Sequence, residues 1–117
     1  MAIDKELLKG STSLLVLKLL NSEDMYGYQI IKELKLKSED VFELKEGTLY
    51  PILHSLESSG IIEAYWEQSE SARKRKYYKI TTKGKKFLKE KEHEWNTYAG
   101  AVKKVLKGGT LSEQGCF

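Results

Sequence analysis

The pattern of apolar and polar residues predicts two helices and a strand in the first part of the chain. Leucines separated by three, four and seven positions indicate one helix over residues 5–21, and the polar sequence NSED that follows favours a turn. A stripe of two isoleucines and a leucine predicts a second, short helix from Tyr26 to Lys35. The apolar run VFEL, residues 41–44, then predicts a short strand.

A third helix is predicted by apolar residues at positions i, i+3, i+4 and i+7. Gly60 marks its end, since glycine is common just past the last helical residue. Pro51 is best tolerated in a first turn, so the helix is expected to start near residues 46–48. The buried stripe consists of Leu49, Ile52, Leu53 and Leu56.

Two runs of β-favouring residues follow the third helix. The sequences IIEAYWEQ (61–68) and KYYKIT (76–81) are joined by the polar sequence SESARKR (69–75). This pattern is typical of a two-stranded ribbon with a charged tip.

A long last helix completes the predicted elements. Thr81 or Thr82 can cap its start, and the helix should run to about Lys107, where Gly108 and Gly109 end it. The fold class is therefore mainly α with a small β-ribbon, arranged as a winged helix-turn-helix with a long C-terminal helix.

The same pattern predicts how the chain is divided. Residues 1–81 should form the winged helix-turn-helix domain, and residues 82–107 should form a dimerisation helix. Residues 108–117 should form a disordered tail, because they are rich in glycine and serine.

The net charge of +3 conceals an uneven distribution. Residues 1–70 hold 7 Lys and Arg against 13 Asp and Glu, whereas residues 71–91 hold 10 against 1. Like charges at this density repel one another unless a polyanion lies nearby, although such a run can also be a solvated loop. The basic residues expected at the ribbon tip are Arg73, Lys74, Arg75 and Lys76.

The N-terminal end of the third helix is a candidate for contact with DNA. On a helical wheel Gly47, Pro51 and His54 face away from the apolar stripe, with Thr48 and Tyr50 on its flanks. Small residues allow close approach, the free backbone N–H groups suit a phosphate, and the tyrosine hydroxyl can donate to one. Alternatively, the glycine and proline only shape the helix start and the tyrosine packs on the core.

The last helix carries an apolar seam with heptad spacing. One set of seam positions is Leu88, Trp95 and Val102, and the other is Lys91, Tyr98 and Val105. The seam is too long for so small a domain to cover, so we predict a homodimer. The alternative is a helix folded back on its own core.

Trp95 lies near the middle of this seam. Two indoles facing each other across a dimer axis would frame an apolar slot for a flat aromatic ligand. Alternatively, Trp95 only anchors the interface.

Other classes of function are disfavoured. His54 and His93 lie on different predicted helices, no metal-ligand spacing occurs, and Cys116 lacks a base, so neither an enzyme nor a metal site nor a cofactor is predicted. No segment has the properties of a signal peptide or a membrane span, which favours a cytoplasmic protein.

Taken together, the motifs resemble the PadR family of bacterial transcriptional regulators, in particular its small members with one C-terminal helix. The resemblance rests on MYGYQIIKEL (25–34), EGTLYPILHSLESSGII (46–62), RKRKYYKITTKGKKFL (73–88) and Trp95, and it spans roughly residues 7–106. It implies a dimeric winged-helix repressor that dimerises through its first and last helices.

The resemblance also implies which residues lie at DNA. By position these are Tyr26, Tyr28, Lys32, Gly47, Thr48, Tyr50, Pro51, His54, Arg73, Lys74, Arg75, Lys76 and Tyr78. In multidrug-responsive relatives a tryptophan of the last helix stacks on planar drugs between subunits, and Trp95 occupies the similar place. The outward face of the third helix lacks arginine, so no base-specific contact is assigned.

The sequence therefore predicts a homodimeric regulator that binds operator DNA and represses transcription until a small planar aromatic ligand releases it. One alternative is a winged-helix module whose basic segment binds an acidic protein. Another is a ligand-binding protein whose DNA contacts are vestigial.

Overall fold

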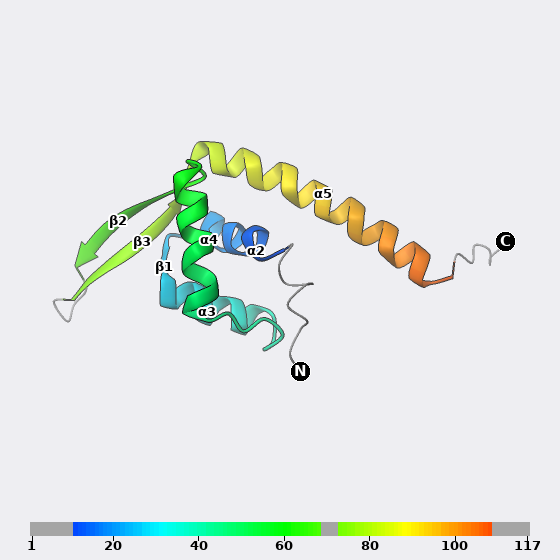
Figure 1. The fold of residues 1–117 in the computed structure, drawn as a ribbon, viewed down its shortest axis with the longest axis horizontal. Helices are drawn as coiled ribbons and strands as arrows, with labels where there is room; N and C mark the ends of the chain where they lie inside the picture. Colours follow the sequence, from blue (N-terminus) through cyan, green and yellow to red (C-terminus); the bar gives the residue numbers. More distant parts are fainter. Residues whose placement is uncertain (1–10, 69–72, 109–117) are drawn as a thin grey trace.

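The chain folds into helices packed on one face of a small sheet, with the last helix extending away from them (Figure 1). The computed structural model describes residues 11–68 and 73–108. The elements are α2 (Thr12–Ser22), β1 (Met25–Tyr26), α3 (Gly27–Lys37), α4 (Glu46–Ser58), β2 (Ile62–Gln68), β3 (Lys74–Ile80) and α5 (Thr82–Leu106). This architecture confirms the predicted mainly helical fold with a β-ribbon.

The core lies between the sheet and the helices α2, α3 and α4. Its fully buried side chains come from every layer, and they include Leu17 of α2, Ile30 of α3, Leu53 of α4 and Ile62 of β2. Burying each such side chain contributes about 1.5–3 kcal/mol, which makes this cluster the main source of stability.

The first helix is shorter than the periodicity predicts. In the described residues α2 begins only at Thr12, after a turn at Ser11, so one continuous helix over 5–21 is wrong. Ser11 is the N-cap, and its carbonyl oxygen accepts the N–H of Leu15 at 3.0 Å. Serine and threonine are common at helix starts, which the apolar spacing does not reveal.

The short strand lies in a different place from the one predicted. Residues 41–44 form no strand; instead β1 pairs antiparallel with β3, giving the strand order β1-β3-β2. Because β3 has a partner on each side, no edge of that strand remains for residues 41–44. They follow a turn in which Glu39 and Asp40 have positive φ, and they contribute the buried Leu44 to the core.

The helix α4 starts at Glu46, within the predicted range, and Gly60 beyond its end has a φ of 77°. Pro51, however, lies inside the helix at its sixth residue rather than in its first turn. A proline there costs about 3 kcal/mol. Burial of Leu49, Leu53 and Leu56 on the opposite face exceeds that cost.

The strand β3 begins two residues earlier than predicted. In the ribbon Gln68 pairs with Lys74, and the pairing continues to Ile62 and Ile80. Lys74, Arg75 and Lys76 therefore lie within a strand rather than at the ribbon tip, and only Arg73 of the four precedes it. Residues 69–72 of the predicted tip lie outside the described residues.

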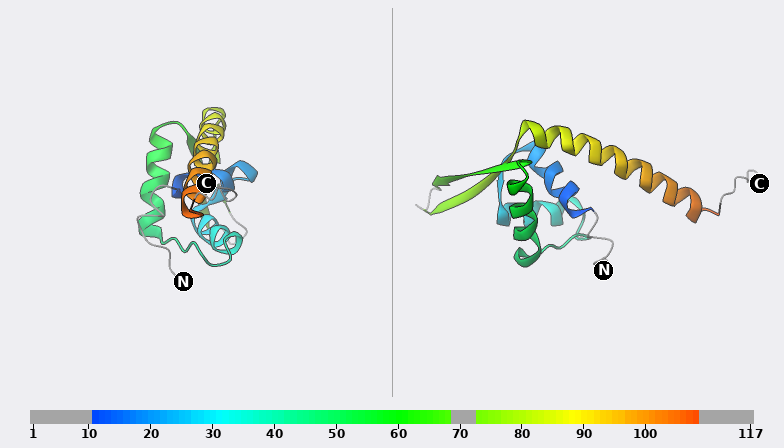
Figure 2. Two further views of the ribbon diagram at one scale, coloured as in Figure 1. Left: turned by 90° about the vertical axis from the view of Figure 1, so that its right-hand side faces the viewer. Right: turned by 45° about the horizontal axis from the view of Figure 1, so that its top comes forward.

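The helix α5 is fixed to the domain at its first turn. Thr81 is the N-cap, as predicted: its Oγ1 accepts the N–H of Gly84 at 3.0 Å and donates to the Gly60 carbonyl oxygen at 2.7 Å. The helix ends at Leu106, and Gly108 follows with a φ of 76°. Residues 109–117, which hold most of the predicted tail, lie outside the described residues. Figure 2 shows α5 extending past all other elements.

The close packing at this first turn generates a prediction. A Cβ added at Gly84 would collide with the carbonyl oxygen of Ile61 and lie 2.8 Å from Cγ1 of Ile80. Since a backbone atom cannot move aside easily, Gly84→Ala should destabilise the protein by about 1–3 kcal/mol, measured by urea unfolding.

Gly47→Ala is the matched control, because a Cβ there meets no atom within 4 Å. It should leave stability unchanged or raise it by up to about 1 kcal/mol. Equal unfolding midpoints for the two variants would contradict the proposed packing at Gly84.

Candidate nucleic-acid interface

The outward face of α4 carries the residues that the sequence singled out. Gly47, Thr48, Tyr50, Pro51 and His54 are all exposed. They lie on the face opposite the buried leucines of the helix, toward its N-terminal end. This half of α4 is therefore open to a partner.

Tyr50 also packs against the start of α3. A Cβ added at Gly27 would collide with the hydroxyl of Tyr50 and lie 2.7 Å from its Cζ atom. The two helix starts approach this closely because Gly27 has no side chain. The tyrosine is nevertheless still 41% exposed, so it combines the packing role with a surface position.

The predicted residues of α3 lie beside that contact. Tyr28 and Lys32 are exposed, while Tyr26 is the half-buried N-cap residue of the helix. The structure thus brings the N-terminal end of α3 next to the N-terminal half of α4.

A row of aromatic rings covers the outer face of the sheet. The Tyr26 and Tyr77 rings meet edge to face with centroids 5.5 Å apart, and Tyr77 stacks on Tyr65 at 5.8 Å. The Arg75 guanidinium lies 4.4 Å from the Tyr26 ring centroid, within the range of a cation–π interaction. The row therefore connects Arg75 on β3 to the residue that starts α3.

The far end of the row is fixed by a hydrogen bond. The Tyr65 hydroxyl donates to Oδ2 of Asp24 at 2.6 Å. This hydrogen bond, followed by burial, raises the pKa of Tyr65 to about 12. The hydroxyl therefore keeps its proton, and its donation to Asp24, into more alkaline solution than an ordinary tyrosine does. Sequence reasoning missed this set, because Tyr26, Tyr65 and Tyr77 meet only through the register of the three strands.

The basic residues of β3 point to opposite sides of the ribbon. Arg75 lies on the outer face, whereas Lys76 is oriented toward α4, with its Nζ 3.9 Å from Oε1 of Glu57. Lys74 and Arg73 are exposed nearer the tip. The cationic segment is therefore spread along the strand and does not form a single cluster at the tip.

Tyr78 does not lie on the surface, contrary to the placement implied by the family resemblance. It is 4% exposed and belongs to the core, and burial raises the pKa of its hydroxyl group. The reason is the two-residue period of a strand: Ile80 is buried, so Tyr78 faces the core as well. Its role is to support the sheet, and Lys76 lies over its ring at 5.6 Å.

The helix α5 exposes most of the predicted seam. Trp95, Tyr98 and Val105 are exposed and Val102 is half-buried, with the Trp95 and Tyr98 rings 6.0 Å apart. Leu88 is an exception, because it is 4% exposed and packs in the core of its own chain. The prediction that Leu88 belongs to the dimer interface is therefore wrong.

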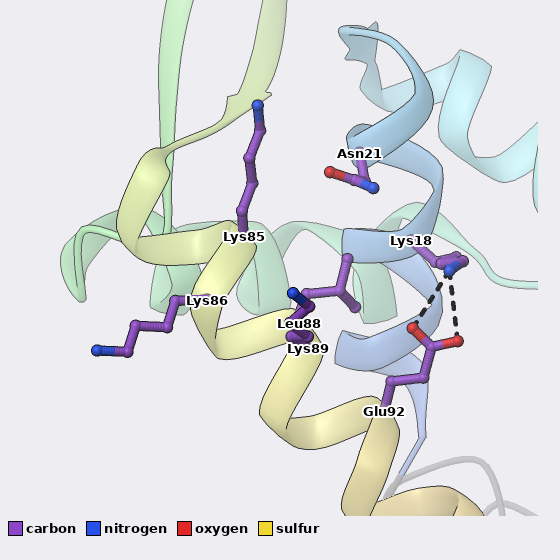
Figure 3. A pocket seen from close by; sticks show the side chains of 7 residues that line it. All are labelled: Lys18, Asn21, Lys85, Lys86, Leu88, Lys89 and Glu92. Carbon is purple, nitrogen blue, oxygen red and sulfur yellow. Dashed lines mark hydrogen bonds and ion pairs between the residues drawn. The ribbon is translucent and has the colours of Figure 1, made fainter.

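A shallow groove of about 450 Å³ lies between α2 and the first half of α5 (Figure 3). Across it Lys18 pairs with Glu92 at 3.2 Å, above the buried Leu88. The lining residues are Lys18, Asn21, Lys85, Lys86, Leu88, Lys89 and Glu92. Trp95 is not among them, so this groove is distinct from the aromatic slot predicted on α5.

Residues 11–68 and 73–108 contain no group of three or more His, Cys, Asp and Glu side chains that could hold a metal ion. Within the same residues, none of the helices has the length and apolar character needed to cross a membrane.

The sheet, the helix pair and the exposed end of α4 together define a winged helix-turn-helix protein, a fold that binds DNA. The model of the PadR-like family of transcriptional regulators matches residues 16–90. The chain belongs to this PadR-like family of transcriptional regulators.

Individual relatives agree with this assignment. An uncharacterized protein X of Lysinibacillus sphaericus is 37% identical over 106 residues, which cover 91% of this chain and 97% of the relative. The structure of a transcriptional regulator from Clostridium thermocellum is similar with a TM-score of 0.79 and 34% identity, covering 86% of this chain and 97% of the other. The crystal structure of a PadR-like transcriptional regulator from Bacillus cereus is similar with a TM-score of 0.77 and 30% identity. The match covers 87% of this chain and 97% of the other.

Proposed function

We propose that this regulator is a homodimeric repressor that binds operator DNA through α3, α4 and the β2–β3 ribbon. One observation carries the proposal: a continuous set of contacts joins the three elements. Arg75 of the ribbon lies on Tyr26, and the next residue, Gly27, packs against Tyr50 of α4. Direct contacts therefore join the ribbon to the starts of α3 and α4 at one place.

In this proposal the N-terminal half of α4 enters the major groove. The free N–H groups at the starts of α3 and α4 approach phosphates, together with the Tyr50 and Tyr28 hydroxyls. Arg73, Lys74 and Arg75 neutralise the backbone next to the groove. Residues 71–91 have a net charge of +9, which gives the affinity a strong dependence on salt.

The second copy is proposed from the apolar surface of α5. Val105 and Leu106 are 77% and 78% exposed, and Trp95 and Tyr98 are exposed on the same helix. Apolar side chains in such numbers on a helix that extends beyond its domain favour an interface with an identical helix. Two copies would place two α4 helices in successive major grooves and block a promoter.

We further propose that a small planar aromatic ligand releases the repressor. Trp95 and Tyr98 are adjacent rings on the exposed face of α5, and a dimer would bring their counterparts near them. A ligand between the α5 helices would change the separation of the two α4 helices and weaken DNA binding. The alternative, in which the basic ribbon binds an acidic protein, uses the same charges but not the exposed end of α4.

Removing the ribbon charges tests the DNA surface. Replacing Arg73, Lys74 and Arg75 with alanine should weaken binding to every duplex and flatten the plot of log K against log salt, by about 0.9 for each phosphate that is no longer neutralised. Fluorescence anisotropy with a labelled duplex from upstream of the gene, at several salt concentrations, measures both effects.

Replacing Lys103, Lys104 and Lys107 with alanine is the matched control. It removes the same charge from exposed positions at the far end of α5, and it should leave the salt slope close to that of the wild type. Equal slopes for the two triple variants would refute the role of the ribbon. An affinity for poly-L-glutamate equal to that for DNA would favour the acidic-protein alternative.

Charging the end of α5 tests the dimer. Val105→Glu with Leu106→Glu should shift the protein from dimer to monomer in sedimentation velocity, because the proposed interface would then bury like charges. Lys103→Glu with Lys104→Glu alters two neighbouring exposed residues of the same helix and should preserve the dimer. A dimer that survives the first pair of substitutions excludes this end of α5 from the interface.

A single-tryptophan variant tests the ligand. The chain has two tryptophans, so Trp66→Phe leaves Trp95 as the only indole. A planar aromatic cation such as proflavine should quench its emission in the absence of DNA, with a saturable dependence on concentration. If quenching is linear and matches that of free tryptophan, no aromatic slot exists at Trp95.

A further inference from the structure

Trp66 is the most exposed aromatic side chain of the ribbon. It lies near the free end of β2 and is 64% exposed, although indole is among the most costly side chains to leave in water. Within residues 11–68 and 73–108 its indole makes no hydrogen bond and no contact with another ring. The fold therefore gives the Trp66 side chain no partner among these residues.

The strand period shows which side of the ribbon carries this indole. Ile62 and Ala64 of β2 face the core, so Trp66 follows them on the same side, while Tyr65 lies on the outer face with Tyr77. Trp66 is thus the next residue on the same face of the strand. It lies beyond the edge of the core, so its side chain is exposed.

This side of the ribbon is also the side on which α4 packs. Trp66 pairs across the ribbon with Lys76, whose Nζ lies 3.9 Å from Oε1 of Glu57 in α4. Gln68 pairs with Lys74 next along the same face. On the α4 side of the ribbon, the exposed indole accordingly lies opposite Lys76 and diagonal to Lys74.

We infer that Trp66 is a further DNA contact, which rests on the proposed function. Its ring lies against the deoxyribose groups of the backbone strand that Lys74 approaches, and its Nε1–H donates to a phosphate oxygen. Indole suits this place because it has an apolar face and one donor, whereas a nucleic-acid backbone presents apolar sugars between acceptor oxygens.

The uncharged nature of indole separates this contact from those of the neighbouring cations. A lysine or arginine at a phosphate releases counterions, so its removal both weakens binding and flattens the salt slope. An indole on sugar releases none. Trp66→Ala should therefore weaken binding to operator and unrelated duplexes alike, roughly tenfold, at an unchanged salt slope.

The first experiment compares three proteins by anisotropy with a labelled duplex at several salt concentrations. Wild type and Trp66→Ala should give parallel salt plots separated by the loss of affinity, and Trp66→Phe should lie between them because it keeps a ring and loses the N–H. The high exposure of the residue makes these substitutions compatible with folding, which circular dichroism checks. Wild-type affinity for Trp66→Ala, or a flattened slope, overturns the inference.

The second experiment uses the indole as its own reporter. Trp95→Phe leaves Trp66 as the only tryptophan, and its emission should change on addition of unlabelled duplex with the same midpoint as the anisotropy curve of that same variant. Trp66→Phe, which retains Trp95, is the matched control and should show a much smaller change. Unchanged Trp66 emission in a protein that does bind the duplex overturns the inference and leaves the proposed function intact.

Two other results distinguish the remaining possibilities. If no duplex binds in the anisotropy assay, the proposed function and this inference both fail. If poly-L-glutamate changes Trp66 emission as strongly as DNA does, the indole contacts an acidic protein and the inference is overturned.

Discussion

The alternation of side chains along β3 is the constraint on which the other parts of the structure depend. The strand pairs with β1 on one side and β2 on the other, so its backbone holds the sheet together. Its inward residues, Tyr78 and Ile80, complete the core, while the outward Arg75 and Tyr77 extend the aromatic row. A shift of one residue would bury the cation and expose the core, so the core fixes the register of the charged surface.

The proposed DNA surface is likewise determined by packing rather than by flexible loops. Gly27 lets α3 approach Tyr50 of α4, and Tyr26 holds the guanidinium of Arg75. Three elements distant in sequence thus share contacts at a single point. A surface assembled in this way is already arranged before a partner arrives, which lowers the entropy lost on binding.

Periodicity was sufficient to locate α3, α4 and the ribbon, because each buries a stripe with a regular repeat, whereas α5 was located by its capping threonine and terminal glycines. It was not sufficient for β1, since two residues carry no period, or for residues 41–44, whose apolar side chains fill the core without strand pairing. The family resemblance placed both Arg75 and Tyr78 at DNA, whereas the strand puts Arg75 on the outer face and Tyr78 in the core. Which of these two residues faces the core is decided by the register of β3. That register depends on pairing with β1 and β2, and β1 lies about 50 residues earlier in the sequence.

The attachment of α5 has a mechanical consequence. Among residues 11–68 and 73–108 the helix is held by the Thr81 cap, the buried Leu88 and the Lys18–Glu92 pair, and its later turns extend beyond these contacts. Beyond Glu92 the helix continues for about 14 residues to Leu106, which span roughly 21 Å. A rotation of about 10° at Glu92 would displace the end of the helix by roughly 4 Å. In the proposed dimer, a small rotation of α5 relative to its domain would therefore change the distance between the two α4 helices. They would then no longer match the spacing of successive major grooves.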